Sequence, residues 1–223
     1  MNKETDMKRS LQRAMAALAL VVAGSFAPAR SASAATPPAK TETVVFAGGC
    51  FWGIQSVFQH TKGVVSATSG YAGGTADRPD YEQVSSGRTG HAESVKVTFD
   101  PSQISYGQLM RVFFSVAHDP TTLNRQGPDV GTQYRSAIFY TTDDQKRATE
   151  AYIDQLNKAH VYSRPIVTEV KASKGFWAAE AYHQNYAELH PDQPYIAIND
   201  APKVANLRKQ FPELYTDKLA AHD

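Results

Sequence analysis

Residues 43–59 decide the fold of this chain and read Thr-Val-Val-Phe-Ala-Gly-Gly-Cys-Phe-Trp-Gly-Ile-Gln-Ser-Val-Phe-Gln. The first five residues are rich in β-branched and aromatic side chains, which favours a short strand, and the two glycines that follow end it. From residue 51 to residue 59 the apolar side chains recur nearer the spacing of a helix than that of a strand. This stretch therefore predicts a strand, a glycine turn and a helix, with Cys50 at the junction.

The rest of the chain continues this alternation. Ser105 is a suitable N-cap for a helix whose apolar face extends to Val116, and Thr142 for a helix that ends near His160. Because strands and helices interleave without an internal repeat, we expect one α/β (α+β) domain with a single sheet of unspecified strand order. The other predicted elements are strands at 63–71, 91–99, 133–140 and 166–170, helices at 176–189 and 204–210, and long loops at 72–90 and 118–132.

The composition is that of an ordinary globular protein. Hydrophobic residues make up 42% of the 223 positions and charged residues 20%, which fits a folded domain. The formal net charge is +1, so the sequence offers no basic surface for nucleic acid.

The N-terminal residues have the pattern of a secretory signal peptide. Lys8, Arg9 and Arg13 precede an apolar run over 14–27, and a small-residue cleavage site follows at 32–34. The run is too short for a membrane span. We therefore expect a soluble product without a membrane anchor, exported to the periplasm or secreted. The predicted organisation is a signal peptide at 1–34, a linker at 35–42, a catalytic domain at 43–190, and a C-terminal tail at 191–223 that wraps the domain or is partly ordered.

Cys50 is the one cysteine of the chain, which excludes an internal disulfide and a zinc site that needs paired thiolates. A lone cysteine is most often a small buried apolar residue. Here, however, two glycines allow a sharp turn before it, and the unpaired N–H groups at a helix start favour a thiolate. We therefore expect a reactive thiol with a lowered pKa.

The sequence around this cysteine resembles peptide methionine sulfoxide reductase A. The segment GCFWG at 49–53 is that family's signature, and further blocks of the family follow in its order between about residues 43 and 189. The resemblance implies reduction of the S epimer of methionine sulfoxide, protein-bound or free, through a cysteine sulfenic acid. It also implies a two-layer sandwich, a ferredoxin-like plait with a mixed sheet and extended loops. The further blocks are GYAGG (70–74), YEQV (81–84), GHAE (90–93), GPDVGTQYRS (127–136) and AEAYHQ (179–184).

The resemblance assigns the two halves of the chemistry to two residues. Cys50 matches the nucleophile that attacks the sulfoxide sulfur, and Glu93 matches the donor of a proton to the oxygen. A proton donor must be protonated near neutral pH, so Glu93 is expected in a desolvated pocket that raises its pKa.

Five further residues match the family's substrate pocket. Tyr81 and Tyr134 match phenols that hydrogen-bond the sulfoxide oxygen, and Asp129 matches an aspartate that supports their network. Phe51 and Trp52 match the aromatic residues that hold the substrate methyl group. No metal and no organic cofactor is expected.

The chain departs from many members of the family in its C-terminal tail. Those members carry additional cysteines there that resolve the oxidised nucleophile as a disulfide, whereas residues 191–223 contain none. Recycling is therefore expected to need an external thiol, such as thioredoxin, glutaredoxin or glutathione, in the repair of oxidised exported proteins.

Three alternatives stay open at this point. Cys50 with His91, His118 or His183 could form a cysteine-hydrolase pair. His91, Glu93 and His118 could bind a metal ion, although their spacing is not that of a helical ligand pair. A protein with the same pocket could also bind oxidised methionine without reducing it.

Overall fold

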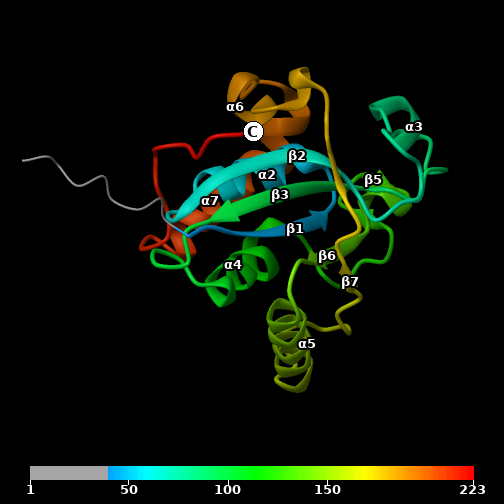
Figure 1. Cartoon of the computed structure of the whole chain (residues 1–223). Coiled ribbons are helices and arrows are strands. Elements are labelled where there is room, and N and C mark those ends of the chain that lie inside the picture. The colour runs from blue at the N-terminus through cyan, green and yellow to red at the C-terminus, as the bar shows by residue number, and fades with distance from the viewer. Residues whose placement is uncertain (1–39) are drawn as a thin grey trace, which may run out of the picture. The chain divides into compact units, whose positions relative to one another are not determined.

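The computed structural model describes residues 40–223 (Figure 1). The predicted signal peptide at 1–34 and the predicted linker up to residue 39 lie outside the described residues. Among the residues described, no helix combines the length and the apolar character needed to cross a membrane.

One mixed sheet of six strands forms the centre of the described unit. Its strand order is β7-β6-β1-β3-β2-β8, and every neighbouring pair is antiparallel except β6 and β7, which are parallel. The expected mixed α/β class is therefore confirmed. The strands are β1 (Glu42–Gly48), β2 (Val64–Ala72), β3 (Ala92–Phe99), β6 (Ser136–Tyr140), β7 (Glu169–Ala172) and β8 (Phe176–Ala178).

Two helices begin at the N-cap residues that the sequence predicts. Ser105 and Gln108 form a reciprocal capping box, and the Thr142 side chain accepts the backbone N–H of Gln145. The helices are α2 (Phe51–Gln59), α3 (Tyr81–Ser85), α4 (Tyr106–Val112), α5 (Asp143–Lys158), α6 (Tyr186–Leu189) and α7 (Ala201–Gln210). Between them lie π-helical turns at Phe113–Ala117 and Ile196–Asp200, 3-10 turns at Thr132–Tyr134 and Ala181–His183, and a small hairpin of β4 (Arg125–Gln126) and β5 (Asp129–Val130).

The two faces of the sheet bury different cores. Side chains alternate along β1, so Val44 and Phe46 join the main core while Val45 and Ala47 join a smaller cluster on the opposite face. The main core contains residues of α2, α4 and α7, with α5 packed against it. Helices α2, α4, α5 and α7 therefore lie on one face of the sheet, and α2 brings its N-terminus to the end of β1.

The helix predicted at 176–189 is wrong. Residues 176–178 instead form β8, which pairs with β2 along the edge of the sheet. The Gln184 side chain bonds the backbone of Ser69 on both its N–H and its C=O, and Asn185 takes a left-handed conformation with φ +56°. The apolar spacing resembled that of a helix because these side chains cover a strand edge.

Residues 191–223 pack on the same unit as the rest of the described chain. Helix α7 lies against α2, and Leu207, Phe211 and Leu214 are buried in the main core. Farther along, Ala221 forms a bridge with Ser66 at the start of β2. The predicted short helix near 204–210 is confirmed as part of α7, which begins three residues earlier.

Candidate active site

Cys50 is the N-cap residue of α2 and follows a turn that only glycine fits. Gly49 has φ +97°, and a Cβ at this position would lie 2.6 Å from the Cβ of Gln126. Only 8% of Cys50 is exposed, and its side chain makes no capping hydrogen bond. The chain thus presents one almost buried sulfur at the start of a helix.

The electrostatic surroundings of this sulfur differ from the expectation. Burial raises the pKa of the Cys50 thiol well above its ordinary value, and the carboxylates of Glu93 and Asp200 raise it further. The backbone N–H of Trp52 and the charge of Lys203 act in the opposite direction. The expected lowering of the pKa is therefore wrong for the unliganded site, because desolvation outweighs the helix N-terminus.

Glu93 lies in the middle of β3 and faces the first turn of α2. It is 2% exposed, and its Oε2 accepts the backbone N–H of Phe51 at 3.0 Å. Burial raises the pKa of this carboxyl to about 8, and the charges of Asp129 and Asp200 add to the rise against the lowering by the Phe51 N–H. The desolvated environment expected for Glu93 is confirmed, and its side chain carries a proton at neutral pH.

Two of the predicted phenols lie beside this carboxyl. Tyr81 opens α3 and Tyr134 closes a 3-10 turn, and both are half-buried. Burial raises the pKa of each phenol, and the charge of Glu93 is the next cause in both cases. Both rings therefore keep their O–H as a hydrogen-bond donor over the whole physiological pH range.

A third phenol belongs to the same group, although nothing in the sequence indicated it. The Tyr195 hydroxyl donates to Oδ2 of Asp129, and burial together with the negative forms of Cys50 and Asp129 raises its pKa. Tyr195 thus ties the predicted C-terminal tail to the β4–β5 hairpin at the site.

The two aromatic residues after Cys50 have different exposures. Phe51 is 1% exposed and packs on Tyr71 and His183, with ring centroids 5.9 and 5.0 Å away. Trp52 stays partly exposed, stacks on Tyr186 at 3.9 Å and donates its indole N–H to Nδ1 of His183 at 3.2 Å. Trp52 is therefore a fixed aromatic surface, with Phe51 beneath it.

Glu180 holds two of these elements together and was not singled out in the sequence. One carboxylate oxygen accepts the hydroxyl of Tyr71, and the other accepts the backbone N–H of Tyr81, each at 2.9 Å. These bonds hold the pKa of Glu180 below its ordinary value despite its partial burial. Glu180 thereby fixes the start of α3 and the position of Tyr81.

His91 and His118 use their ring nitrogens for structural hydrogen bonds away from Cys50. His118 uses both ring nitrogens, on the Phe113 carbonyl at 3.1 Å and the Ser136 hydroxyl at 2.7 Å, and burial lowers its pKa to about 4. His91 bonds the backbone of the 74–76 loop through both nitrogens. Among residues 40–223 no three His, Cys, Asp or Glu side chains gather as a metal site.

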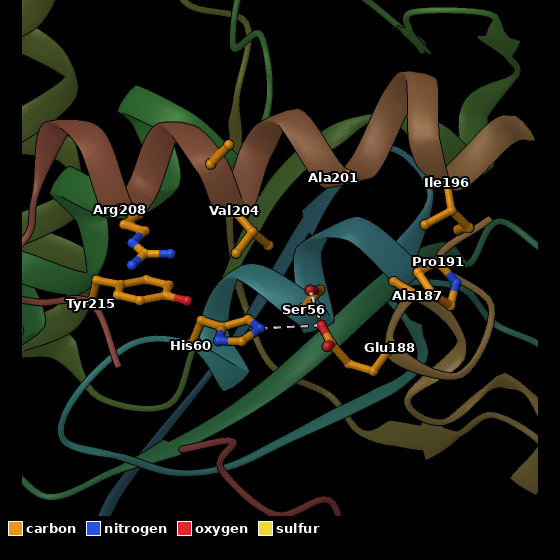
Figure 2. A pocket seen from close by; sticks show the side chains of 11 residues that line it. Ser56, His60, Ala187, Glu188, Pro191, Ile196, Ala201, Val204, Arg208 and Tyr215 are labelled. Carbon is orange, nitrogen blue, oxygen red and sulfur yellow. Dashed lines mark hydrogen bonds and ion pairs between the residues drawn. The ribbon is translucent and has the colours of Figure 1, made fainter. Parts of the chain in front are cut away.

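A separate cavity of about 300 Å³ lies between α2, α6 and α7 (Figure 2). Glu188 Oε1 in its wall accepts the hydroxyl of Ser56 at 2.6 Å and lies 3.2 Å from Nε2 of His60. None of the seven predicted site residues lines this cavity, so it is distinct from the space around Cys50.

The fold and the site together define a mixed α/β protein with one cysteine at the start of a helix, next to a buried carboxyl and several phenols. The sequence profile of the family described as peptide methionine sulfoxide reductase matches residues 42–215. The chain belongs to this family: it is an enzyme that reduces methionine sulfoxide to methionine. The reaction of the family needs no metal or organic cofactor.

Relatives and solved structures agree with this assignment. MsrA 2 of Mesorhizobium japonicum is 60% identical over 178 residues, which cover 80% of this chain and 91% of the relative. MsrA of Deinococcus radiodurans is 51% identical over 183 residues, 82% of this chain and 86% of the relative. Reduced Mxr1 of Saccharomyces cerevisiae superposes with a TM-score of 0.63 at 33% identity, covering 70% of this chain and 90% of that one. Methionine sulfoxide reductase A of Corynebacterium diphtheriae gives 0.59 at 36% identity, covering 70% and 77%.

Proposed function

We propose that Cys50 attacks the sulfur of the S epimer of methionine sulfoxide while Glu93 protonates its oxygen. The observation that carries this proposal is the buried Glu93 carboxyl, hydrogen-bonded to the N–H of Phe51 directly beside Cys50, with a pKa of about 8. One pH unit below its pKa, the protonated form of an acid outnumbers the ionised form by about ten to one. The Glu93 carboxyl therefore holds the proton that it donates at pH 7.

The oxygen transfer balances without any other reactant. The thiol sulfur first forms a bond to the sulfoxide sulfur. The bond between the two sulfurs and the S–O bond of the substrate then break, and the oxygen forms a bond to the Cys50 sulfur, which becomes a sulfenic acid. Methionine leaves with its sulfur reduced by two electrons, and the Cys50 sulfur is oxidised by two. Glu93 gives its proton to the oxygen and regains one from the Cys50 thiol, so the carboxyl is unchanged at the end.

Tyr81 and Tyr134 are proposed to bind the sulfoxide oxygen, with Asp129 holding its network through Tyr195. The raised pKa values of both phenols support this, because donors that never ionise suit a polar oxygen. A buried oxygen without a donor costs about 1–3 kcal/mol, whereas a buried methyl contributes about 0.8 kcal/mol. The phenols therefore separate sulfoxide from thioether, and Trp52 over Phe51 sets the position of the methyl group and the epimer.

We propose that an external thiol recycles the enzyme, as in a single-cysteine reductase. The thiol attacks the sulfenic acid and releases water, giving a mixed disulfide, and a second thiol then frees Cys50. Thioredoxin, glutaredoxin or glutathione has the chemistry required. The signal-peptide pattern at residues 1–34 supports export to the periplasm or outside the cell, with protein-bound and free methionine sulfoxide there as substrates.

We also propose that the central four strands form a ferredoxin-like plait. Support comes from their order, β6-β1-β3-β2, with antiparallel pairing throughout and with α2 and α4 as the connections after β1 and β3. In this arrangement β7 and β8 are additions at the two edges.

A single turnover without added reductant tests the proposed reaction. We expect up to one equivalent of methionine per protein from the S epimer and none from the R epimer. Cys50→Ser removes the product, since a serine hydroxyl has almost no anionic form at neutral pH. Binding of the S epimer without any product from the wild-type protein would support the binder and overturn the enzyme mechanism.

A further inference from the structure

Asp200 is a buried carboxylate at the junction of two helical segments. It is the last residue of the π-helical turn Ile196–Asp200, which continues directly into α7, and its backbone is helical. The residue is 1% exposed, its Oδ1 lies 3.0 Å from Nζ of Lys203, and its Oδ2 has no hydrogen-bond partner among the described residues. Lys203 is therefore the one side chain in the described residues that the Asp200 carboxylate contacts by a hydrogen bond or ion pair.

The carboxylate lies on the first turn of α2. A Cβ added to Gly53 would stand 2.1 Å from Oδ1 of Asp200 and 2.8 Å from Nζ of Lys203. Gly53 is the third residue of α2, whose N-cap is Cys50. The Asp200–Lys203 pair therefore occupies the space that any side chain at Gly53 would need, one helical turn from the reactive sulfur.

Lys203 is the cation of this pair. It lies on α7, three residues after Asp200, and 21% of its side chain is exposed. The other charged groups that act on Cys50, namely Glu93 from β3 and Asp200, are acidic. Lys203 thus supplies positive charge to a site otherwise built from carboxyls and phenols.

The remaining titratable groups at the site come from four further segments. They are Asp129 of β5, Tyr134 of the 3-10 turn that precedes β6, Tyr81 of α3, and Tyr195 just before the π-helical turn Ile196–Asp200. Each phenol keeps its proton over the working pH range, so none of them supplies a countercharge for an anionic sulfur.

We propose that Asp200 and Lys203 are positioning residues that control the charge of the Cys50 sulfur in opposite directions. Lys203 stabilises the sulfur as an anion, and Asp200 anchors Lys203 over the first turn of α2 while opposing that anion. The effect falls on two steps: Cys50 loses its proton during attack on the sulfoxide, and it leaves as a thiolate when the second external thiol breaks the mixed disulfide. This inference rests on the proposed role of Cys50 as the nucleophile.

The pH dependence of Cys50 alkylation by iodoacetamide tests the proposal without any sulfoxide. Since the chain contains one cysteine, the adduct measured by intact mass reports this sulfur alone. Lys203→Met is expected to move the midpoint of the rate profile upward by about one pH unit, which is about tenfold slower at a fixed pH below it. Asp200→Asn, whose amide oxygen still accepts from Lys203, is expected to move the midpoint downward. Lys203→Arg keeps the wild-type midpoint.

Lys209→Met is the matched control, because Lys209 is an exposed lysine in the last turn of the same helix. It should leave the midpoint unchanged. Opposite shifts for the two members of the pair support the proposal, since a merely structural pair would change both profiles in the same direction or not at all. Shifts of the same sign, no shift, or an equal shift in Lys209→Met would overturn it. Single-turnover reduction of the S epimer by the wild-type protein is measured separately, so a failure of the proposed function is recognised independently.

Discussion

The Glu93 carboxyl lies on β3, a strand paired on both sides, and its only hydrogen bond within the described residues comes from the Phe51 N–H. A single donor does not compensate an ionised carboxylate for the loss of water, so the neutral form is preferred. Burial destabilises the ionised form of Glu93 and thereby keeps the carboxyl protonated near neutral pH. The position of Glu93 on β3 thus makes it able to act as a proton donor.

Glu93→Gln keeps the shape and a hydrogen-bond donor but cannot deliver a proton. Loss of a general acid typically costs about 10²–10⁴-fold in rate, and we expect the single-turnover rate with the S epimer to fall by that order. Substrate affinity should change only modestly, because the amide still donates. Glu150→Gln, an exposed change on α5, serves as the control with wild-type rate. A retained rate at saturation with lost binding would make Glu93 a binding residue instead.

The raised pKa of Glu93 also links stability to pH. The folded chain holds the proton up to about pH 8, whereas the unfolded chain releases it near the ordinary value of 4.5. The contribution of Glu93 is therefore fully present below pH 4.5 and is lost as the pH rises through about 8. We expect the free energy of unfolding of the wild type, measured in urea, to fall over this window relative to Glu93→Gln. Parallel curves for the two proteins would show that the carboxyl is not protonated in the fold.

At the scale of elements, Gly53 connects α2 with α7. Gly53→Ala improves helix propensity by about 1 kcal/mol, but the new Cβ would meet Asp200 Oδ1 at 2.1 Å, and overpacking of this kind typically costs about 1–3 kcal/mol. We expect a net loss of stability in Gly53→Ala that Asp200→Ala relieves in the double variant. Thermal unfolding of the four proteins gives the coupling, and additive changes would contradict the contact. Gly107→Ala, at a glycine of α4 where a Cβ meets nothing closer than 3.9 Å, is the matched control.

Helix α2 could be predicted with its observed limits, residues 51–59, because its apolar spacing and the glycines before it are local signals. The prediction of a helix at 176–189 is wrong because the backbone of residues 176–178 pairs with β2, and no local pattern encodes that tertiary pairing. The short α3 and the β4–β5 hairpin fell in segments read as loops, since each is held by contacts with distant parts of the chain. Local patterns thus gave the central elements, and the edges depended on tertiary contacts.

The difference between local sequence signals and tertiary contacts also explains which site residues could be predicted. Cys50 was indicated by the local signals of the glycine turn and the helix start, whereas the six other predicted residues came from the resemblance of short blocks to a family. The structure brings these six together near Cys50. Tyr195 and Lys203 lie in the segment that was expected to wrap the domain or to be partly ordered, and no site residue was predicted there. The Tyr195–Asp129 bond joins positions 66 residues apart, so neither composition nor periodicity could reveal it.

For the whole molecule, the decisive fact is that the C-terminal segment folds onto the site yet brings no second thiol to it. Residues 195–203 supply a phenol, a carboxylate and a lysine around Cys50, and the 223 residues contain no other cysteine. An oxidised Cys50 therefore has no internal partner for a disulfide. The oxidised state should persist until a thiol from outside reaches it.

Intact-mass analysis after one turnover without reductant tests this consequence. We expect the protein to gain the mass of one oxygen, as a sulfenic acid, and not to lose the two hydrogens of a disulfide. A sulfenate-trapping reagent should then label Cys50, and Cys50→Ser treated in the same way is the control that must stay unlabelled. Addition of glutathione or of a thioredoxin with its reducing system should return the original mass and restore turnover, because attack of the external thiol on the sulfenic acid releases the oxygen as water. A full equivalent of methionine with unmodified Cys50 and no added thiol would show that the oxygen leaves by a route this mechanism does not contain.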